Sequence, residues 1–161
     1  MIPFTRRHVL SLFPGALAAC GLPPEQAAPQ RTMKFNPPLY PNETAELRRL
    51  INKWSDNYEV PRELVHRLAI RESTHNPGAR NGPYYGLLQI LPQTARGMGF
   101  RGSATELLNA DTNLQYAVKY LRGAWLVSDG DQDKAISWYA RGYYYEAKRR
   151  GMLIATGLRK G

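Results

Sequence analysis

Glu72 is the residue of this sequence that is best placed for acid–base chemistry. It ends a helical pattern in which Leu64 and Leu68 recur at intervals of four residues, and such positions share one face of a helix. Burial on that face and the negative end of the helix dipole both disfavour a charged carboxylate. We therefore expect a raised pKa for Glu72, as a general acid at neutral pH requires. The alternative is a structural glutamate paired with Arg71 or Arg80.

The helix that carries Glu72 has clear limits in the sequence. Pro61 suits its first turn, because the N–H that proline lacks would have no partner there in any case. Asn76-Pro77-Gly78 ends the helix shortly after Glu72. Its other polar side chains are expected to point away from the core: Arg62, His66, Arg67 and Arg71.

The elements around this helix are also predicted to be helical. An amphipathic helix is expected after Asn42, which suits an N-cap, and its apolar residues keep helical spacing up to Trp54. Later segments with helical patterns are 92–97, a short helix capped by Ser103 and Glu106, 111–125, 131–139 and 143–150. A loop is expected over 80–86, because it contains Asn81-Gly82-Pro83. No run alternates as a strand does, so the predicted fold class is mainly α.

Composition limits the classes of protein to consider. The chain has 161 residues, enough for one domain with its own core, and a net charge of +9. Positive charge suits nucleic acid, anionic lipid or an acidic polymer, but no nucleic-acid motif accompanies it. The single cysteine, Cys20, excludes an intrachain disulfide and forms no metal-ligand spacing with the histidines. The Asp-rich segment 129–133 lacks the turn glycine of a calcium loop, so no metal or cofactor is expected.

Residues 1–19 are predicted to be a signal peptide. Two arginines precede an apolar run that has roughly half the length of a membrane-spanning helix. Leu17-Ala18-Ala19-Cys20 resembles a bacterial lipoprotein signal, in which Cys20 is acylated and becomes the mature N-terminus. The alternative is an ordinary secretory signal. Thr5 to Leu10 also resembles a twin-arginine export signal, so the export route stays open.

The segment 20–41 is predicted to be a tether, because it is rich in proline and cannot form a regular hydrogen-bond ladder. A ligand for a proline-binding domain is the alternative. The tether would join a lipid anchor at Cys20 to a domain over 42–151, which a tail over 152–161 follows. This organisation predicts a lipoprotein on the periplasmic face of a bacterial membrane, with the outer membrane preferred.

Three blocks of sequence occur in a fixed order around these features. The first consists of Glu72-Ser73, Asn76-Pro77, Gly86-Leu87-Leu88-Gln89-Ile90 and Pro92-Gln93-Thr94-Ala95. The second is Asn109 to Leu114 with Tyr120-Leu121, and the third is Trp138-Tyr139-Ala140-Arg141-Gly142. Together they resemble the soluble lytic transglycosylase family, whose third block reads Ala-Tyr-Asn-Ala-Gly. The resemblance covers about residues 44 to 150.

The resemblance implies a single helical domain with a goose-type-lysozyme-like fold and a catalytic cleft. It implies cleavage of the β-1,4 bond between N-acetylmuramic acid and N-acetylglucosamine in peptidoglycan, with formation of a 1,6-anhydro ring and with Glu72 as acid and base. The expected substrate-binding residues are Ser73, Asn81, Tyr85, Gln89 and Tyr139. The expected partner is the peptidoglycan glycan strand, bound by a monomer without a cofactor.

The sequence departs from the family pattern beside Tyr139. Ala140 and Arg141 replace the usual Asn and Ala, so the contact of that Asn is lost and substrate preference can differ, and His75 replaces a usual aromatic residue. Two other interpretations stay open. A hydrolytic lysozyme would need a second carboxylate, for which Asp111 and the segment 129–133 are the nearest candidates. A non-catalytic peptidoglycan-binding protein is favoured by the two replacements beside Tyr139.

Overall fold

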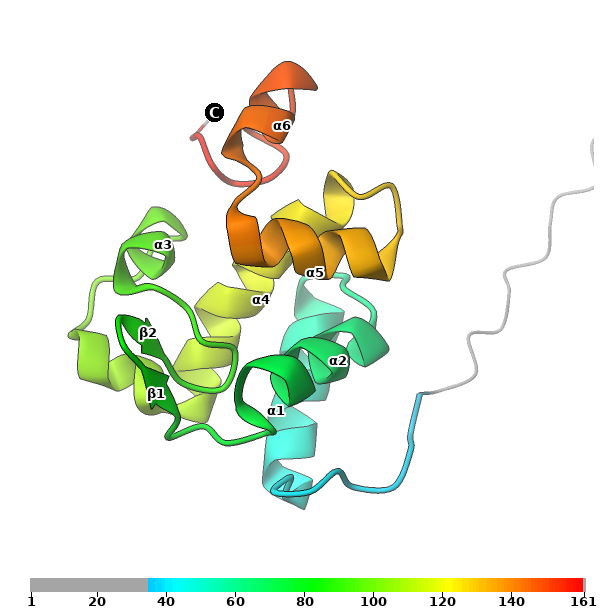
Figure 1. The fold of residues 1–161 in the computed structure, drawn as a ribbon, viewed down its shortest axis with the longest axis vertical. Coiled ribbons are helices and arrows are strands. Elements are labelled where there is room, and N and C mark those ends of the chain that lie inside the picture. The colour runs from blue at the N-terminus through cyan, green and yellow to red at the C-terminus, as the bar shows by residue number, and fades with distance from the viewer. Residues whose placement is uncertain (1–34, 161) are drawn as a thin grey trace, which may run out of the picture. The chain divides into compact units, whose positions relative to one another are not determined.

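The computed structural model describes residues 35–160, so the predicted signal peptide and Cys20 lie outside the described residues. The fold is mainly helical, as predicted (Figure 1). The helices are α1 (Ala45–Asn57), α2 (Arg62–Ser73), α3 (Pro92–Gly97), the 3-10 helix η1 (Ala104–Leu108), α4 (Ala110–Leu126), α5 (Gln132–Arg141) and α6 (Tyr144–Arg149). No helix in this part of the chain is both long and apolar enough to cross a membrane.

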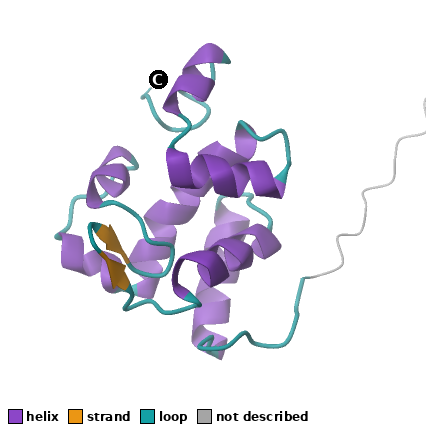
Figure 2. Ribbon diagram, in the orientation of Figure 1, coloured by secondary structure: helices purple, strands orange, loops and turns teal. Residues whose placement is uncertain are grey.

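A small hairpin lies where the sequence predicted only a loop. Figure 2 shows its two strands, β1 (Arg80–Asn81) and β2 (Tyr84–Tyr85), which pair antiparallel. Each strand has two residues, too few for an alternating pattern to be recognised in the sequence. Gly82 in the turn has a positive φ of 56°, which glycine adopts without strain.

Helix α1 begins two residues later than predicted. Thr44 is its N-cap, and its hydroxyl group accepts a hydrogen bond of 3.1 Å from the Leu47 N–H. Asn42 has φ 64°, whereas an N-cap residue has extended backbone. Its side-chain amide instead donates to the carbonyl oxygen of Thr74, just after α2, at 3.1 Å. Asn42 therefore fastens the approach to α1 onto the end of the helix that carries Glu72.

Helix α4 is the central element of the core and packs against α1, α3, η1 and α5. Its inward stripe consists of apolar residues that are fully buried: Leu114, Ala117, Val118, Leu121 and Ala124. Facing residues of α1 and α2, such as Ile51 and Leu68, are also fully buried. The periodicity seen in the sequence thus gives the correct inward faces of the long helices.

The last residues of the predicted tether contact the domain. The guanidinium group of Arg48 on α1 donates to the carbonyl oxygen of Pro37 at 2.9 Å and to that of Pro38 at 3.2 Å. The ring of Tyr40 stacks on that of His75, with centroids 5.0 Å apart and planes 8° apart. A proline carbonyl is a good acceptor although proline has no N–H to donate, so this segment is fixed through its oxygens and one aromatic ring.

Candidate active site

Glu72 lies in the last turn of α2, at the wall of a cavity of about 300 Å³. Its side chain is 22% exposed, so it is half-buried but open to a substrate. Burial raises the pKa of Glu72, and the cation of Arg71 opposes this effect. The Arg71 Nε atom is 3.5 Å from the Glu72 Oε1 atom, and the Arg71 side chain is 51% exposed. Solvent weakens so exposed a pair, which leaves desolvation as the dominant effect.

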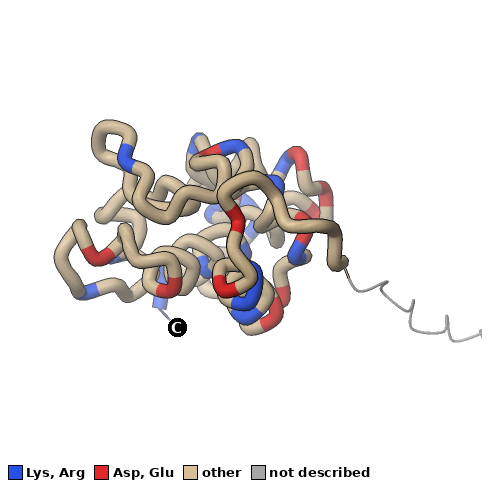
Figure 3. Tube along the Cα trace, turned by 90° about the horizontal axis from the view of Figure 1, so that it is seen from below, with Lys and Arg blue, Asp and Glu red and all other residues tan. Residues whose placement is uncertain are grey.

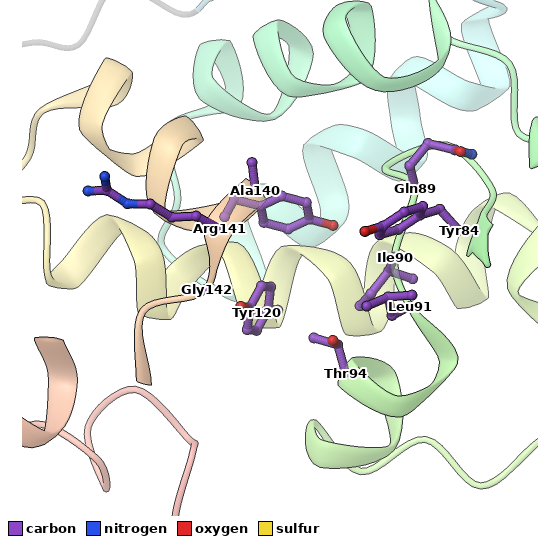
Figure 4. A pocket seen from close by; sticks show the side chains of 10 residues that line it. Tyr84, Gln89, Ile90, Leu91, Thr94, Tyr120, Ala140, Arg141 and Gly142 are labelled. Atoms are coloured by element: carbon purple, nitrogen blue, oxygen red, sulfur yellow. The ribbon is translucent and has the colours of Figure 1, made fainter. Parts of the chain in front are cut away.

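A second cavity of about 210 Å³ adjoins the first, and four residues line both: Tyr84, Gln89, Tyr139 and Ala140. The two cavities therefore form one cleft, with Glu72 at one end and Thr94, Tyr120 and Arg141 at the other. Figure 4 shows Tyr84 directing its hydroxyl group into the second cavity, above Ile90 and Leu91. The cleft combines aromatic rings with a few polar groups, which suits sugar binding.

Tyr139 joins the wall of the cleft to the turn below it. Its hydroxyl group donates to the carbonyl oxygen of Leu88 at 2.8 Å, and the side chain is buried. Burial raises the pKa of Tyr139 well above its usual value, and the carboxylate of Glu72 adds to the shift. Tyr139 therefore stays protonated, and its oxygen keeps a lone pair available to accept a hydrogen bond.

The side-chain amide of Gln89 is buried and holds the turn before α3. Its Nε2 atom donates to the carbonyl oxygens of Gly86 at 2.8 Å and Ala79 at 3.1 Å. Its Oε1 atom is buried and has no hydrogen-bond partner among the described residues. Gln89 lines both cavities, but its amide is turned into the protein, so Gln89 shapes the wall of the cleft through the rest of its side chain (Figure 4).

Ser73 has a role in holding the backbone. Its hydroxyl group donates to the carbonyl oxygen of Leu87 at 2.7 Å and accepts from the Asn76 N–H at 3.1 Å. It thus ties the end of α2 to the turn that carries Gln89. Ser73 lies outside the residues that line the two cavities.

The hairpin supplies Asn81 and Tyr84 to the cleft. Asn81, expected to bind substrate, lines the cavity of Glu72. Tyr85, also expected to do so, lies outside the lining residues, and the guanidinium group of Arg80 stacks on its ring at 4.8 Å. Tyr84 lines both cavities, but it was not among the substrate-binding residues expected from the sequence. Neighbouring residues of a strand point to opposite sides, so recognising the hairpin would have made Tyr84 the alternative to Tyr85.

Asn113 on α4 is a second residue that sequence reasoning assigned no role. It is fully buried, and its Nδ2 atom donates to the carbonyl oxygens of Tyr85 at 2.8 Å and Leu107 at 2.9 Å. Its Oδ1 atom accepts from the Leu88 N–H at 3.0 Å. Asn113 therefore positions the turn between β2 and α3. Its place within the second family-like block was the feature of the sequence that could have indicated this role.

The acidic residues considered as a second carboxylate are engaged elsewhere. Asp111 accepts from the indole N–H of Trp54 at 2.6 Å and from Lys53 at 3.0 Å. Asp129 pairs with Arg150 at 2.8 Å, and Asp131 caps α5. Among the residues that line the two cavities, Glu72 is the acidic one, and it lines the first cavity. A hydrolytic mechanism that uses Asp111 or the segment 129–133 is therefore not supported.

One buried group of residues has the chemical types of metal ligands: Glu43, His66 and His75. His66 was expected to point away from the core, but it is fully buried, and its Nδ1 atom is 3.0 Å from His75 Nε2. The reason is that the segment before α1 covers this side of α2. Arg48 donates to both oxygens of Glu43 at 2.6 Å. A divalent cation here would add charge beside that buried guanidinium, so we assign the group a structural role.

The helical domain and its cleft, with a half-buried carboxyl group at one end, define an all-α domain of the lysozyme-like type. Residues 49–150 match the family model of the Transglycosylase SLT domain, and the chain belongs to this family. A comparison with curated proteins gave no match. Because proteins with this domain are generally peptidoglycan transglycosylases, the family supports an enzyme that acts on peptidoglycan.

We predict that Tyr139→Phe lowers turnover of a peptidoglycan substrate by about ten- to a thousandfold, the range for one positioned polar group near developing charge. Stability should fall by about 1 kcal/mol, because the carbonyl oxygen of Leu88 loses its partner. Steady-state kinetics and thermal unfolding measure the two effects.

Tyr143→Phe is the matched control. Its buried hydroxyl group also donates to a carbonyl oxygen, that of Tyr120, at 2.8 Å, but Tyr143 does not line the cleft. It should lose similar stability and keep its turnover. Equal turnover in both variants would show that Tyr139 only packs.

We predict that the free energy of unfolding decreases by on the order of 2 kcal/mol between about pH 7 and pH 5. Burial lowers the pKa of His66 from 6.5 to about 4 and also lowers that of His75. The unfolded chain therefore binds more protons in this window, so the stability is complete above pH 6.5 and is lost as the pH falls towards 4.

Urea unfolding at several pH values checks this expectation. It is best made in the Glu72→Gln background, because a raised carboxyl pKa changes stability with the opposite sign. His75→Phe keeps an aromatic ring against Tyr40 and removes one titrating group, so its pH dependence should be shallower. An unchanged free energy between the two pH values would contradict a buried, neutral histidine pair.

Proposed function

We propose that this protein is a lytic transglycosylase, which cleaves the bond between N-acetylmuramic acid and N-acetylglucosamine and leaves a 1,6-anhydromuramic end. The observation that carries the proposal is the position of Glu72, half-buried at the wall of a cleft within a Transglycosylase SLT domain. A carboxyl group whose pKa is raised by burial retains its proton closer to neutral pH.

In the proposed reaction Glu72 acts twice. Its proton passes to the glycosidic oxygen as the bond from that oxygen to C1 of the muramic sugar breaks. The acetamido group of the sugar can stabilise the positive charge at C1, as in substrate-assisted glycosidases. The carboxylate of Glu72 then takes the proton of the C6 hydroxyl group, whose oxygen forms the new bond to C1. Water is not consumed, and Glu72 ends the cycle protonated.

The other residues of the cleft bind and orient the sugar. Asn81 and Tyr84 supply a side-chain amide and a phenol, and Gln89 shapes the wall beside them. Tyr139, held by its bond to Leu88, has a lone pair for a substrate hydroxyl group. Ring closure by the C6 hydroxyl group gains from being intramolecular, so the cleft needs to hold one sugar in position and needs no second carboxylate.

A non-catalytic peptidoglycan-binding protein is the second candidate. Ala140 and Arg141 favour it, because they replace the family's Asn and Ala in the wall of the cleft. Glu72 itself argues for catalysis, since a half-buried carboxyl group whose ion-pair partner among the described residues, Arg71, is exposed costs stability that a binding surface has no need to sacrifice.

Mass spectrometry of fragments released from purified peptidoglycan in heavy-oxygen water tests the proposal. We predict anhydromuramic ends that lack one water and carry no label. Glu72→Gln should abolish release while the fold is retained, and Glu63→Gln, the same change in the first turn of α2, should not. Reducing ends that carry heavy oxygen would show a hydrolase, and the release of no fragments would show a binding protein.

We also propose that the chain is a monomeric lipoprotein on the periplasmic face of the outer membrane, anchored through Cys20. The support is the sequence over 1–20 alone. The mass of the mature N-terminus in wild type and Cys20→Ala tests this proposal, and an unmodified wild-type N-terminus would exclude it.

A further inference from the structure

Trp138 and Arg141 form a stacked pair at the end of α5. They are three residues apart, so they lie on neighbouring turns of one helix face. The guanidinium carbon of Arg141 is 3.7 Å from the centre of the Trp138 ring. In the family's Ala-Tyr-Asn-Ala-Gly block both positions are Ala, so the two large side chains of the stack are a coupled departure of this chain.

The stack holds the guanidinium group in place and leaves its edge free. Trp138 is half-buried and packs against the core, so it is a firm support, whereas Arg141 is exposed. An indole ring covers one face of the guanidinium group, but the N–H donors lie in its plane and point outwards. An arginine ordered in this way loses little side-chain entropy when it binds an anion.

Arg141 differs from other basic residues of the domain in its surroundings. Basic and acidic positions are interspersed along the described chain (Figure 3). Several pair across elements, as Arg67 does with Asp133 and Arg150 with Asp129. Within residues 35–160 no carboxylate lies within ion-pair distance of Arg141. Its in-plane donors are therefore available to an external acceptor.

The position of Arg141 suits a group that projects from a bound strand. Arg141 lines the second cavity, whereas Glu72 lines the first. Figure 4 shows the Arg141 side chain extending away from Tyr84 and beyond the labelled lining residues. A sugar in the cleft would lie between Tyr84 and Ala140, and a substituent on that sugar would leave the cleft near this end.

We infer that Arg141, supported by Trp138, binds a carboxylate of the peptidoglycan stem peptide and gives the protein a preference for peptide-bearing glycan strands over strands without peptides. The inference rests on the proposed function for the identity of the strand. Planar guanidinium groups bind carboxylates through two parallel hydrogen bonds, and stem peptides carry carboxylates where the sugar chain itself has few. Arg141 is thus a specificity-determining residue at a distance from the reacting bond.

The test compares two substrates, intact peptidoglycan strands and the same strands after an amidase has removed their peptides. The measured quantity is the ratio of kcat/KM for peptide-bearing to peptide-free strands. Arg141→Ala, which restores the family residue, should lower this ratio by about three- to tenfold, as expected for one charge-assisted bond at an exposed site. The lower ratio should come from a higher KM for peptide-bearing strands, and the difference from wild type should become smaller at high salt.

Two variants serve as comparisons. Arg141→Lys keeps the charge but not the flat pair of donors, so its ratio should fall to an intermediate value. Lys148→Ala removes one positive charge on α6 and should leave the ratio unchanged. A ratio that falls equally for Lys148→Ala would show an effect of net charge and would overturn the inference.

The remaining outcomes separate failure of the inference from failure of the proposed function. If Arg141→Ala leaves the ratio unchanged, the inference fails although the proposed function stands. If both substrates lose equally, Arg141 binds a group that both strands carry, such as an acetamido carbonyl oxygen, and if peptide-free strands lose more, it binds the lactyl carboxylate that the amidase frees; in either case the peptide assignment is wrong. If the wild-type protein cleaves neither substrate, the proposed function fails. In that case the same ratio is measured from the dissociation constants of soluble fragments with and without peptides. An unchanged ratio in Arg141→Ala overturns the inference, and a fall of about three- to tenfold supports it.

Discussion

The side-chain amide of Asn113 is the contact on which the geometry of the cleft depends. It joins α4 to the carbonyl oxygens of Tyr85 and Leu107 and to the N–H of Leu88, all within 3.0 Å and largely away from water. Each buried group left without its partner would cost about 1–3 kcal/mol. Gly86 completes the arrangement, because a Cβ atom there would lie 2.3 Å from Asn113 Nδ2. The turn before α3 is therefore held to the central helix by polar contacts that no apolar residue can replace.

The turn before α3 also sets the positions of the residues that form the cleft. Ser73 at the end of α2 bonds to the carbonyl oxygen of Leu87, and Tyr139 on α5 bonds to that of Leu88. Three helices that are distant in the sequence thus converge on two neighbouring peptide groups. Glu72 precedes Ser73, and Gln89 follows Leu88, so the acid and this residue of the cleft wall are placed by the same set of bonds. The arrangement is rigid because each bond is buried or half-buried and fixed at both ends.

The sequence predicted those features that depend on a single element. The apolar period gives the helices and their inward faces, and the same period places Glu72 at the end of α2, half-buried as expected. Features that depend on two distant elements were not predictable in this way. Tyr84 enters the cleft only because β1 and β2 pair, and His66 is buried only because residues 35–40 fold back over α2. Asn113 shows the same limit, since its helix gives no reason for a buried amide until the turn before α3 lies against it.

Desolvation of Glu72 keeps its carboxyl group protonated at a higher pH than that of a free glutamate. A ¹³C NMR titration of the Glu72 side-chain carboxyl carbon in the folded protein measures this directly, with the Glu72→Gln variant to assign the signal. We predict a midpoint above the ordinary value of 4.5, because burial outweighs the exposed cation of Arg71. A midpoint at or below 4.5 would contradict it, since Glu72 would then be an ordinary carboxylate held by Arg71 and not a general acid.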